Sequence, residues 1–254
     1  MGAALGGLAL HAGTRSAYLA VFALDAAFLG CAPVLGRLPA VAPAPAPSGG
    51  GPGLAVLRDR PYALLALLNA LMLRMTLLSL ALPLWIVERA AAPGWTVSAL
   101  LVLNTVVVML CQVRAARSAT DLATAVRAVR WSGAVMCAAC AVFAFSGAPE
   151  GGHGAGAGGA VAVLVLGAVL QVLAEMRHSA GSWQIGSALA PADRIGQYQG
   201  FYGSGVPVAR AFGPLLVTPL LIGRGVPGWL LLGGVFLVAG AATGPAVRWA
   251  DTAR

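Results

Sequence analysis

The sequence predicts an all-α fold: a polytopic integral membrane helical bundle with about seven transmembrane helices. Of its 254 residues, 59% are hydrophobic and only 9% are charged, whereas a soluble domain carries roughly 25% charged residues. The hydrophobic residues form long blocks of about the 20 residues that a helix needs to cross a bilayer. The sixteen basic residues are all arginines separated by these apolar blocks. A nucleic-acid-binding surface would cluster them on one polar face, so we expect the lipid bilayer, and no nucleic acid, as the partner.

The apolar blocks define seven candidate spans. Most connections between them are short, which implies antiparallel neighbours in one bundle. The exception is a Pro/Gly-rich stretch, and it divides the chain into an N-terminal segment with one transmembrane helix (1–38), a cytoplasmic linker (39–60) and a six-helix unit (61–254). The predicted spans are Ser16–Gly36, Tyr62–Ile86, Thr96–Val113, Trp131–Gly147, Ala160–Gly186, Gln199–Ile222 and Gly228–Val247.

The arginines between the spans predict the orientation, because cytoplasmic loops carry an excess of positive charge. Ten lie in loops on one side and three on the other. We therefore expect a multi-pass protein of the inner (plasma) membrane with its C-terminus in the cytoplasm. The ten are Arg37, Arg58, Arg60, Arg114, Arg117, Arg127, Arg130, Arg194, Arg248 and Arg254, and the three are Arg15, Arg89 and Arg224.

Ionisable groups inside the spans are the main functional signal, because a charge in hydrocarbon costs at least about 2.5 kcal/mol and usually faces a cavity or a partner. The fourth and seventh spans contain none, so we interpret that pair as lipid-facing. The spans that contain charges are interpreted as lining a water-filled pathway. The positions are Asp25, Arg74, Glu175, Arg177, His178 and Arg210.

Four polar residues of the fifth span, Gln171, Glu175, His178 and Ser182, are spaced so that they share one helix face. A carboxylate one turn from an imidazole can relay protons or contact a substrate. The alternative is a polar seam satisfied by neighbouring helices, or a histidine and an arginine that snorkel toward the inner interface, and it is the favoured interpretation for His178. It is also favoured for Arg177, which points about 160° away on a 3.6-residue helix.

The second and sixth spans contribute weaker polar positions. Asn69 belongs to a polar stripe in the second span, and Tyr202 and Arg210 lie in the sixth. Arg210 could serve as the counter-ion of Glu175 or Asp25. Repeated Gly and Pro residues interrupt the sixth span, so it either hinges or packs closely through glycine.

Tryptophan and cysteine residues predict interfaces and packing. Five tryptophans near span ends are typical of interfacial belts, and Cys137 and Cys140 are interpreted as small helix-packing residues. The five tryptophans are Trp85, Trp95, Trp131, Trp229 and Trp249.

Nucleotide-binding, zinc and hydrolase motifs are missing from the sequence, so we expect no enzyme, no metal and no cofactor.

Five stretches carry a family pattern: RDRPYALLALLNA, RAARSATDLATAVRAVR, EMRHSAGSWQIGSALAP, GQYQGFYGSG and FGPLL. Over Ser16 to Ala250 the chain resembles the C-terminal half of a major facilitator superfamily transporter of the drug-efflux-like branch, with the spans corresponding to helices 6–12. The resemblance implies that helices seven, eight, ten and eleven line a central cavity and that nine and twelve face lipid. It also implies alternating access, often as proton antiport, with a coupling role for Glu175.

The sequence departs from the family in two ways. The loop motif Gly-x-x-x-Asp-Arg-x-Gly-Arg-Arg survives only as scattered Arg117, Asp121, Arg127 and Arg130. The family also has five helices before these, so we expect a truncated gene, a wrongly assigned start, or one half that needs an N-terminal half or a homo-oligomer.

The leading hypothesis is therefore a secondary active transporter, or its C-terminal half, that couples efflux of small organic molecules to protons. The alternative is a truncated, non-transporting membrane remnant or helix-packing subunit, and an integral membrane enzyme is a weaker third. The predicted substrate or proton pathway comprises Glu175, His178, Gln171, Arg210, Asn69, Arg74, Asp25 and Tyr202.

Overall fold

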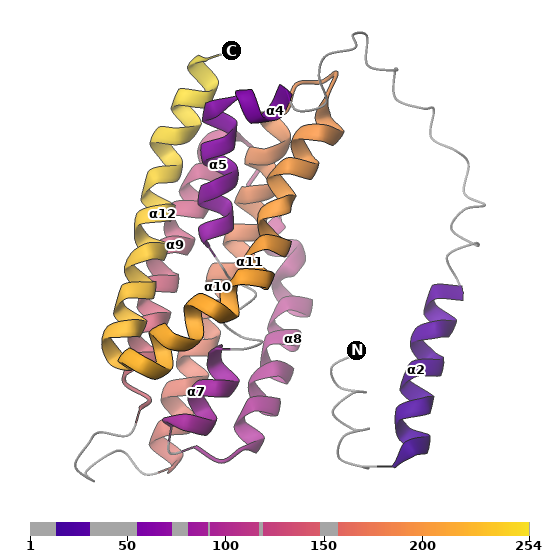
Figure 1. The fold of residues 1–254 in the computed structure, drawn as a ribbon, viewed down its shortest axis with the longest axis vertical. Helices are drawn as coiled ribbons and strands as arrows, with labels where there is room; N and C mark the ends of the chain where they lie inside the picture. Colours follow the sequence, from indigo (N-terminus) through magenta and orange to yellow (C-terminus); the bar gives the residue numbers. More distant parts are fainter. Residues whose placement is uncertain are drawn as a thin grey trace. The chain divides into compact units, whose positions relative to one another are not determined.

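The computed structural model describes residues 14–30, 55–72, 81–90, 92–116, 119–147 and 157–253. The chain divides into two units, Met1–Gly49 and Gly50–Arg254. The first contributes one described helix, α2 (Arg15–Gly30). Within the described ranges there is no sheet, only an isolated bridge between Ala90 and Gly147, so the all-α prediction is confirmed for them. The helices of the second unit are α4 (Ala55–Arg58), α5 (Arg60–Leu71), α7 (Leu82–Glu88), α8 (Trp95–Ala116), α9 (Leu122–Ala144), α10 (Ala157–Ala188), α11 (Ile195–Arg224) and α12 (Val226–Thr252) (Figure 1).

Four helices of the second unit are long and apolar enough to cross a membrane, which makes the chain a multi-pass membrane protein. Helix α11 is a fifth span if its segments Ile195–Gly213 and Thr218–Arg224, which meet at 45°, are counted together. The four are Trp95–Ala115, Leu122–Ala144, Gly158–Ala188 and Val226–Thr252.

The first two predicted spans do not meet this criterion within the described residues. Helix α2 has 16 residues, fewer than the roughly 20 that cross a ~30 Å core, and the predicted span continues to Gly36, outside the described part. The predicted span Tyr62–Ile86 corresponds to α5 and α7, and residues 73–80 between them lie outside the described ranges.

The basic stretch before the fourth predicted span is helical, which corrects that boundary. Helix α9 begins at Leu122 rather than Trp131 because Asp121 and Thr124 form a reciprocal capping box. The added turns bury small residues three to four positions apart, so the stretch has one packed face and one exposed face that carries Arg127 and Arg130. The buried residues of these turns are Ala125, Ala128 and Val129.

Helix α9 packs most extensively against α10 and α12. The backbones meet at glycines: a Cβ on Gly133 would lie 2.7 Å from the Phe236 carbonyl oxygen of α12, and one on Gly181 would lie 2.6 Å from the Ala125 carbonyl oxygen of α9. Such close approach is how membrane helices gain packing contacts without a hydrophobic driving force. Cys140 is buried in the same α9–α12 contact, where a Cβ on Gly233 would lie 3.2 Å from its Cβ.

Two of the five tryptophans predicted for interfacial belts are core residues. Trp85 and Trp229 are almost fully buried, and their rings meet edge to face with centroids 5.6 Å apart. The indole Nε1 of Trp85 donates to the Ser146 hydroxyl at 2.9 Å. The belt interpretation is therefore wrong for this pair, since large aromatic rings gain more from packing in the bundle than from the interface. Trp95, Trp131 and Trp249 are exposed.

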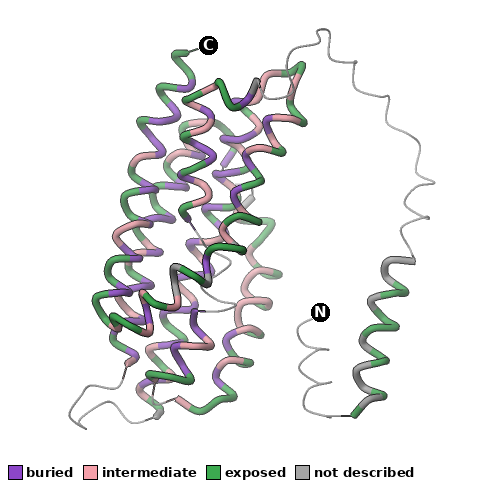
Figure 2. Tube along the Cα trace, in the orientation of Figure 1, coloured by how far each residue is buried: buried purple, intermediate pink, exposed green. Residues whose placement is uncertain are grey.

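Helix α8 is the least buried of the four candidate membrane spans. Figure 2 shows mostly exposed and intermediate positions along α8, whereas α9, α10 and α12 have buried positions along their length. Helices α9 and α12 each bury one face and expose the other, including Leu237 and Val238 of α12. The predicted third span, which corresponds to α8, also contains no charged residue, although only the fourth and seventh spans were predicted to face lipid.

Candidate functional site

Three helices bring together a cluster of polar side chains. Asn69 comes from α5, His178 and Ser182 from α10, and Tyr202 from α11; Asn69 is half-buried and the other three are buried. The Oδ1 atom of Asn69 accepts a hydrogen bond from the Ser182 hydroxyl at 2.7 Å and lies 3.0 Å from the Nε2 atom of His178. The Asn69 amide nitrogen donates to the Tyr202 carbonyl oxygen at 3.4 Å, and the hydroxyls of Ser182 and Tyr202 lie 3.2 Å apart. Asn69 is thus the hub of the cluster.

The spacing of residues along each helix explains why these side chains meet. His178 and Ser182 are four residues apart on α10 and therefore share a face. The next turn of that face carries Gly186, where a Cβ would lie 3.1 Å from the Tyr202 ring. On α11, Gly205 lets the helix touch α5, since a Cβ there would lie 2.7 Å from that of Ala70. Small residues therefore bring α10, α11 and α5 close enough for short side chains to bond across them.

The contact with Asn69 determines the tautomer of the imidazole. An amide oxygen can only accept, so the Nε2 atom of His178 carries the proton that points at Asn69. The Nδ1 atom is then the nitrogen at which the ring can gain or lose a second proton. Protonation would create a charge within the candidate span Gly158–Ala188.

A second group of side chains extends this cluster toward the end of the bundle where α5 begins. The hydroxyl of fully buried Tyr62 lies 3.1 Å from the Gly186 carbonyl oxygen and 3.2 Å from that of Tyr198. The rings of Tyr62 and Tyr198 meet edge to face at 4.7 Å. The Tyr198 hydroxyl donates to the Oδ2 atom of Asp59 at 3.2 Å, and the other carboxylate oxygen of Asp59 caps α5.

Tyr62, Tyr198 and Asp59 are not among the predicted pathway residues, although helical spacing carries a signal for the two tyrosines. Tyr62 lies seven residues before Asn69, and Tyr198 lies four residues before Tyr202. Each pair therefore shares a helix face. No such spacing connects Asp59 with Tyr198, because their contact depends on how α5 and α11 pack.

Gln171 and Glu175 lie on α10 one to two turns from His178. Gln171 is completely buried, and neither atom of its side-chain amide has a hydrogen-bond partner among the described residues. An unsatisfied buried amide is costly, so such a group is a natural place for a water molecule or a polar ligand group to bind. Glu175 is half-buried on the same helix.

The structure brings Asn69, His178 and Tyr202 together out of the eight predicted pathway residues. Arg74 lies outside the described residues, and Asp25 in α2 and Arg210 in α11 have side chains outside them. Arg177 is exposed on α10, and its guanidinium carbon lies 5.1 Å from the centroid of the Trp131 ring on α9. Its position is that of a cation–π contact between neighbouring helices.

Within the described ranges, no group of three His, Cys, Asp or Glu residues could hold a metal ion. The cluster instead offers an imidazole, an amide and two hydroxyls between three helices, a set suited to proton exchange and to hydrogen bonding.

Comparison with known proteins adds no relative. No family model matches the sequence, and neither a curated protein nor a solved structure matches it.

Proposed function

We propose that this chain is a secondary active membrane transporter, or the C-terminal half of one, that exports small organic molecules in exchange for protons by alternating access. The observation that carries the proposal is the contact between His178 and Asn69, which places a titratable side chain in the hydrogen bonds joining two helices of a membrane protein. The resemblance of the sequence to major facilitator transporters supports the same function.

Proton binding at this site can change helix packing. An imidazole exchanges protons near neutral pH, and Glu175 lies one turn away on the same helix. A charge inside a membrane bundle is costly unless it is hydrated or paired. Protonation of His178 therefore favours an arrangement of α5, α10 and α11 that admits water or a counter-charge, which is the two-state behaviour that a coupled transporter needs.

The bend in α11 offers a place for that rearrangement. The segment before it carries Tyr202 of the cluster, and the segment after it runs to Arg224 at the opposite end of the bundle. Gly213 and Pro214 lie at the bend, and a proline removes a backbone hydrogen bond from the helix ladder. We infer that α11 hinges there.

The arginines of the second unit support a cytoplasmic C-terminus. Seven described arginines lie at the end where α5, α9 and α11 begin and α12 finishes, and two lie at the other end. By the positive-inside rule the first end faces the cytoplasm. The seven are Arg58, Arg60, Arg114, Arg127, Arg130, Arg194 and Arg248, and the two are Arg89 and Arg224.

A non-transporting helix-packing protein is the second candidate, and one observation favours it. Asn69 bonds to α10 through its oxygen and to α11 through its nitrogen, so the cluster can serve simply to hold three helices together. In that case the polar groups contribute stability and specificity, as interhelical hydrogen bonds do in other membrane bundles.

Proteoliposomes distinguish the two candidates. The purified chain is reconstituted with ethidium, a cationic aromatic probe, and with pyranine to report internal pH, and a pH gradient is imposed. We expect gradient-driven ethidium movement with counterflow of protons, and loss of both in Glu175→Gln. Glu88→Gln is the matched control, because it removes the same charge from an exposed residue at the end of α7.

The possible results distinguish coupled transport, the role of Glu175 and the helix-packing function. Ethidium and proton movement that vanish in Glu175→Gln and persist in Glu88→Gln support coupled transport through the α10 face. Equal movement in both variants contradicts the coupling role of Glu175. Absence of gradient-driven movement in the unsubstituted chain contradicts transport by this chain alone and supports the helix-packing function.

A further inference from the structure

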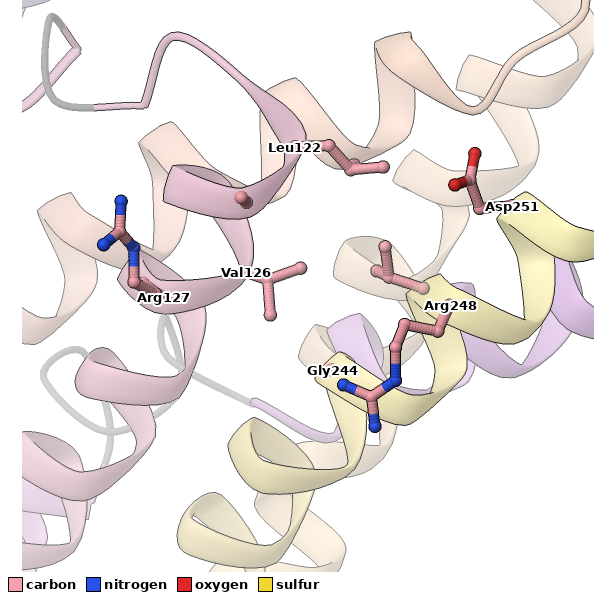
Figure 3. A pocket seen from close by; sticks show the side chains of 8 residues that line it. Leu122, Val126, Arg127, Gly244, Arg248 and Asp251 are labelled. Atoms are coloured by element: carbon pink, nitrogen blue, oxygen red, sulfur yellow. The ribbon is translucent and has the colours of Figure 1, made fainter.

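A groove between α9 and α12 opens at the arginine-rich end of the bundle. It has a volume of about 580 Å³ and lies where α9 begins and α12 finishes (Figure 3). Its walls are mainly apolar, with Leu122 and Val126 on α9 facing Val247 on α12. Because both helices are candidate membrane spans, the groove is positioned at the boundary between hydrocarbon and headgroups.

Two of the residues that line this apolar groove are arginines, one on each helix. Arg127 and Arg248 line it, and Gly244 lies between two arginines, since a Cβ there would be 3.7 Å from the Cδ of Arg130 and 4.0 Å from a guanidinium nitrogen of Arg248. All three arginines are exposed. The described residues contain one ion pair, Arg194 with Asp193, so none of the three guanidinium groups at the groove is neutralised by a carboxylate partner.

Two carboxylates lie in the same region. Asp251 lines the groove without pairing to Arg248, and Asp121 is engaged in the cap of α9 by Thr124. Three guanidinium groups against two carboxylates leave the region net positive. The available guanidinium groups therefore favour an anionic ligand.

We propose that this groove binds an anionic phospholipid of the surrounding leaflet. Guanidinium groups match the geometry and charge of a phosphate, and the apolar wall of Leu122, Val126 and Val247 accommodates the hydrophobic part of the same molecule. A basic pocket between transmembrane helices on the cytoplasmic side is the setting in which anionic headgroups bind. A soluble phosphate uses the arginines but leaves the apolar wall in contact with water, so the lipid is the better fit.

The groove floor at Gly244 is part of the site. A leucine there would extend toward Val126, Arg130 and Arg248 and occupy the space between the two helices. Gly244→Leu therefore blocks the groove without changing its charge. The arginine variants remove charge at exposed positions and leave the packed face of α9 and α12 intact.

The test measures lipid retention by native mass spectrometry of the full chain extracted from mixed phosphatidylglycerol and phosphatidylcholine nanodiscs. We expect preferential retention of phosphatidylglycerol and a loss of affinity of about thirtyfold in Arg127→Gln/Arg248→Gln, given about one kcal/mol for each surface arginine. Arg58→Gln/Arg60→Gln is the matched control, because it removes the same charge at the same end of the bundle outside this groove.

The outcomes separate a specific site from general attraction. Loss of phosphatidylglycerol in the groove variants and in Gly244→Leu, with retention in the control pair, supports the proposal. Equal loss in both arginine pairs, or equal retention of the two lipids by the unsubstituted chain, overturns it. Inorganic phosphate at millimolar concentration is added in a separate arm, and displacement of the lipid by phosphate alone overturns the assignment to a lipid.

Discussion

The Nε2 atom of His178 lies 3.0 Å from the Oδ1 atom of Asn69, and this contact joins α10 to α5 inside the bundle. The same oxygen accepts from Ser182, and the amide nitrogen of Asn69 reaches the Tyr202 carbonyl oxygen. One side chain therefore connects three helices. Its removal affects all three contacts at once.

Asn69→Leu tests this role. The substitution keeps a similar volume but removes the acceptor that Ser182 and His178 share, so we expect the free energy of unfolding to fall by about 1–3 kcal/mol. Thermal unfolding of the purified protein in detergent measures the change. Asn104→Leu is the control, because Asn104 is half-buried on α8 and its side-chain Oδ1 atom has no hydrogen-bond partner among the described residues. We expect that variant to be neutral or more stable, and equal destabilisation by both would show that Asn69 is not a hub.

Hydropathy predicted the helical class and most helix positions, because a long apolar block has few alternatives to a helix in a membrane. Spacing also predicted that His178 and Ser182 share a face of α10. Spacing cannot predict which residues of another helix meet that face, since this depends on the rotation and depth of α5 and α11. Ser182 was recognised as part of the polar face, but its bond to Asn69 required the packed structure.

The incorrect predictions also arise because the packing of the helices decides which residues are buried. Trp85 and Trp229 lie near span ends, where tryptophan usually contacts headgroups, yet they pack on each other in the core. The arginines before Trp131 favour a loop, so the predicted fourth span begins at Trp131. The capping pair Asp121 and Thr124 instead starts the helix nine residues earlier, and exposed arginines on one side of a helix are compatible with a buried apolar face.

Gly133→Ala should separate α9 from α12. The new Cβ would lie 2.7 Å from the Phe236 carbonyl oxygen and 3.1 Å from the Cα of Gly240, and neither backbone atom can rotate away. We expect destabilisation of about 1–3 kcal/mol, as for other overpacked sites, measured by thermal unfolding in detergent. Gly234→Ala on α12 is the matched control, since its Cβ would meet nothing within 4 Å and alanine favours the helix by up to about 1 kcal/mol. Opposite signs are expected, and two equal effects would contradict backbone contact at Gly133.

Ser146→Ala should destabilise the core through Trp85. The substitution removes the acceptor of the buried Trp85 indole N–H, at a cost of about 1–3 kcal/mol for the unsatisfied donor. The double variant with Trp85→Phe tests the cause, because without the N–H the loss of Ser146 should cost less. Ser204→Ala serves as the control. The hydroxyl groups of Ser146 and Ser204 each donate to the carbonyl oxygen three residues earlier, but Ser204 is exposed, so its replacement should change the stability little. Strict additivity of Trp85→Phe and Ser146→Ala would rule out the proposed link.

The cap of α9 predicts a pH dependence. The Asp121 carboxylate accepts from the Thr124 backbone N–H at 2.7 Å, and this bond, followed by the Thr124 side-chain bond, lowers the pKa of Asp121 below its ordinary value. Because the folded state holds the ionised carboxylate, its stabilisation is complete above the unfolded-state pKa of about 4 and is lost as pH falls through the lower folded-state pKa. Asp121→Ala should therefore lower the midpoint of thermal unfolding by a few degrees at pH 7.

The difference between the unsubstituted protein and Asp121→Ala should narrow as pH falls below about 4, because the carboxyl group that makes the cap then becomes protonated. Unfolding midpoints measured from pH 7 to pH 3 in one detergent follow this change. Asp251→Asn provides the comparison, since Asp251 is exposed in the last turn of α12, where a negative charge is unfavourable to the helix dipole, and its removal should be neutral or stabilising at pH 7. A gap between Asp121→Ala and the unsubstituted protein that stays constant over the whole range would mean that the carboxylate does not stabilise the start of α9.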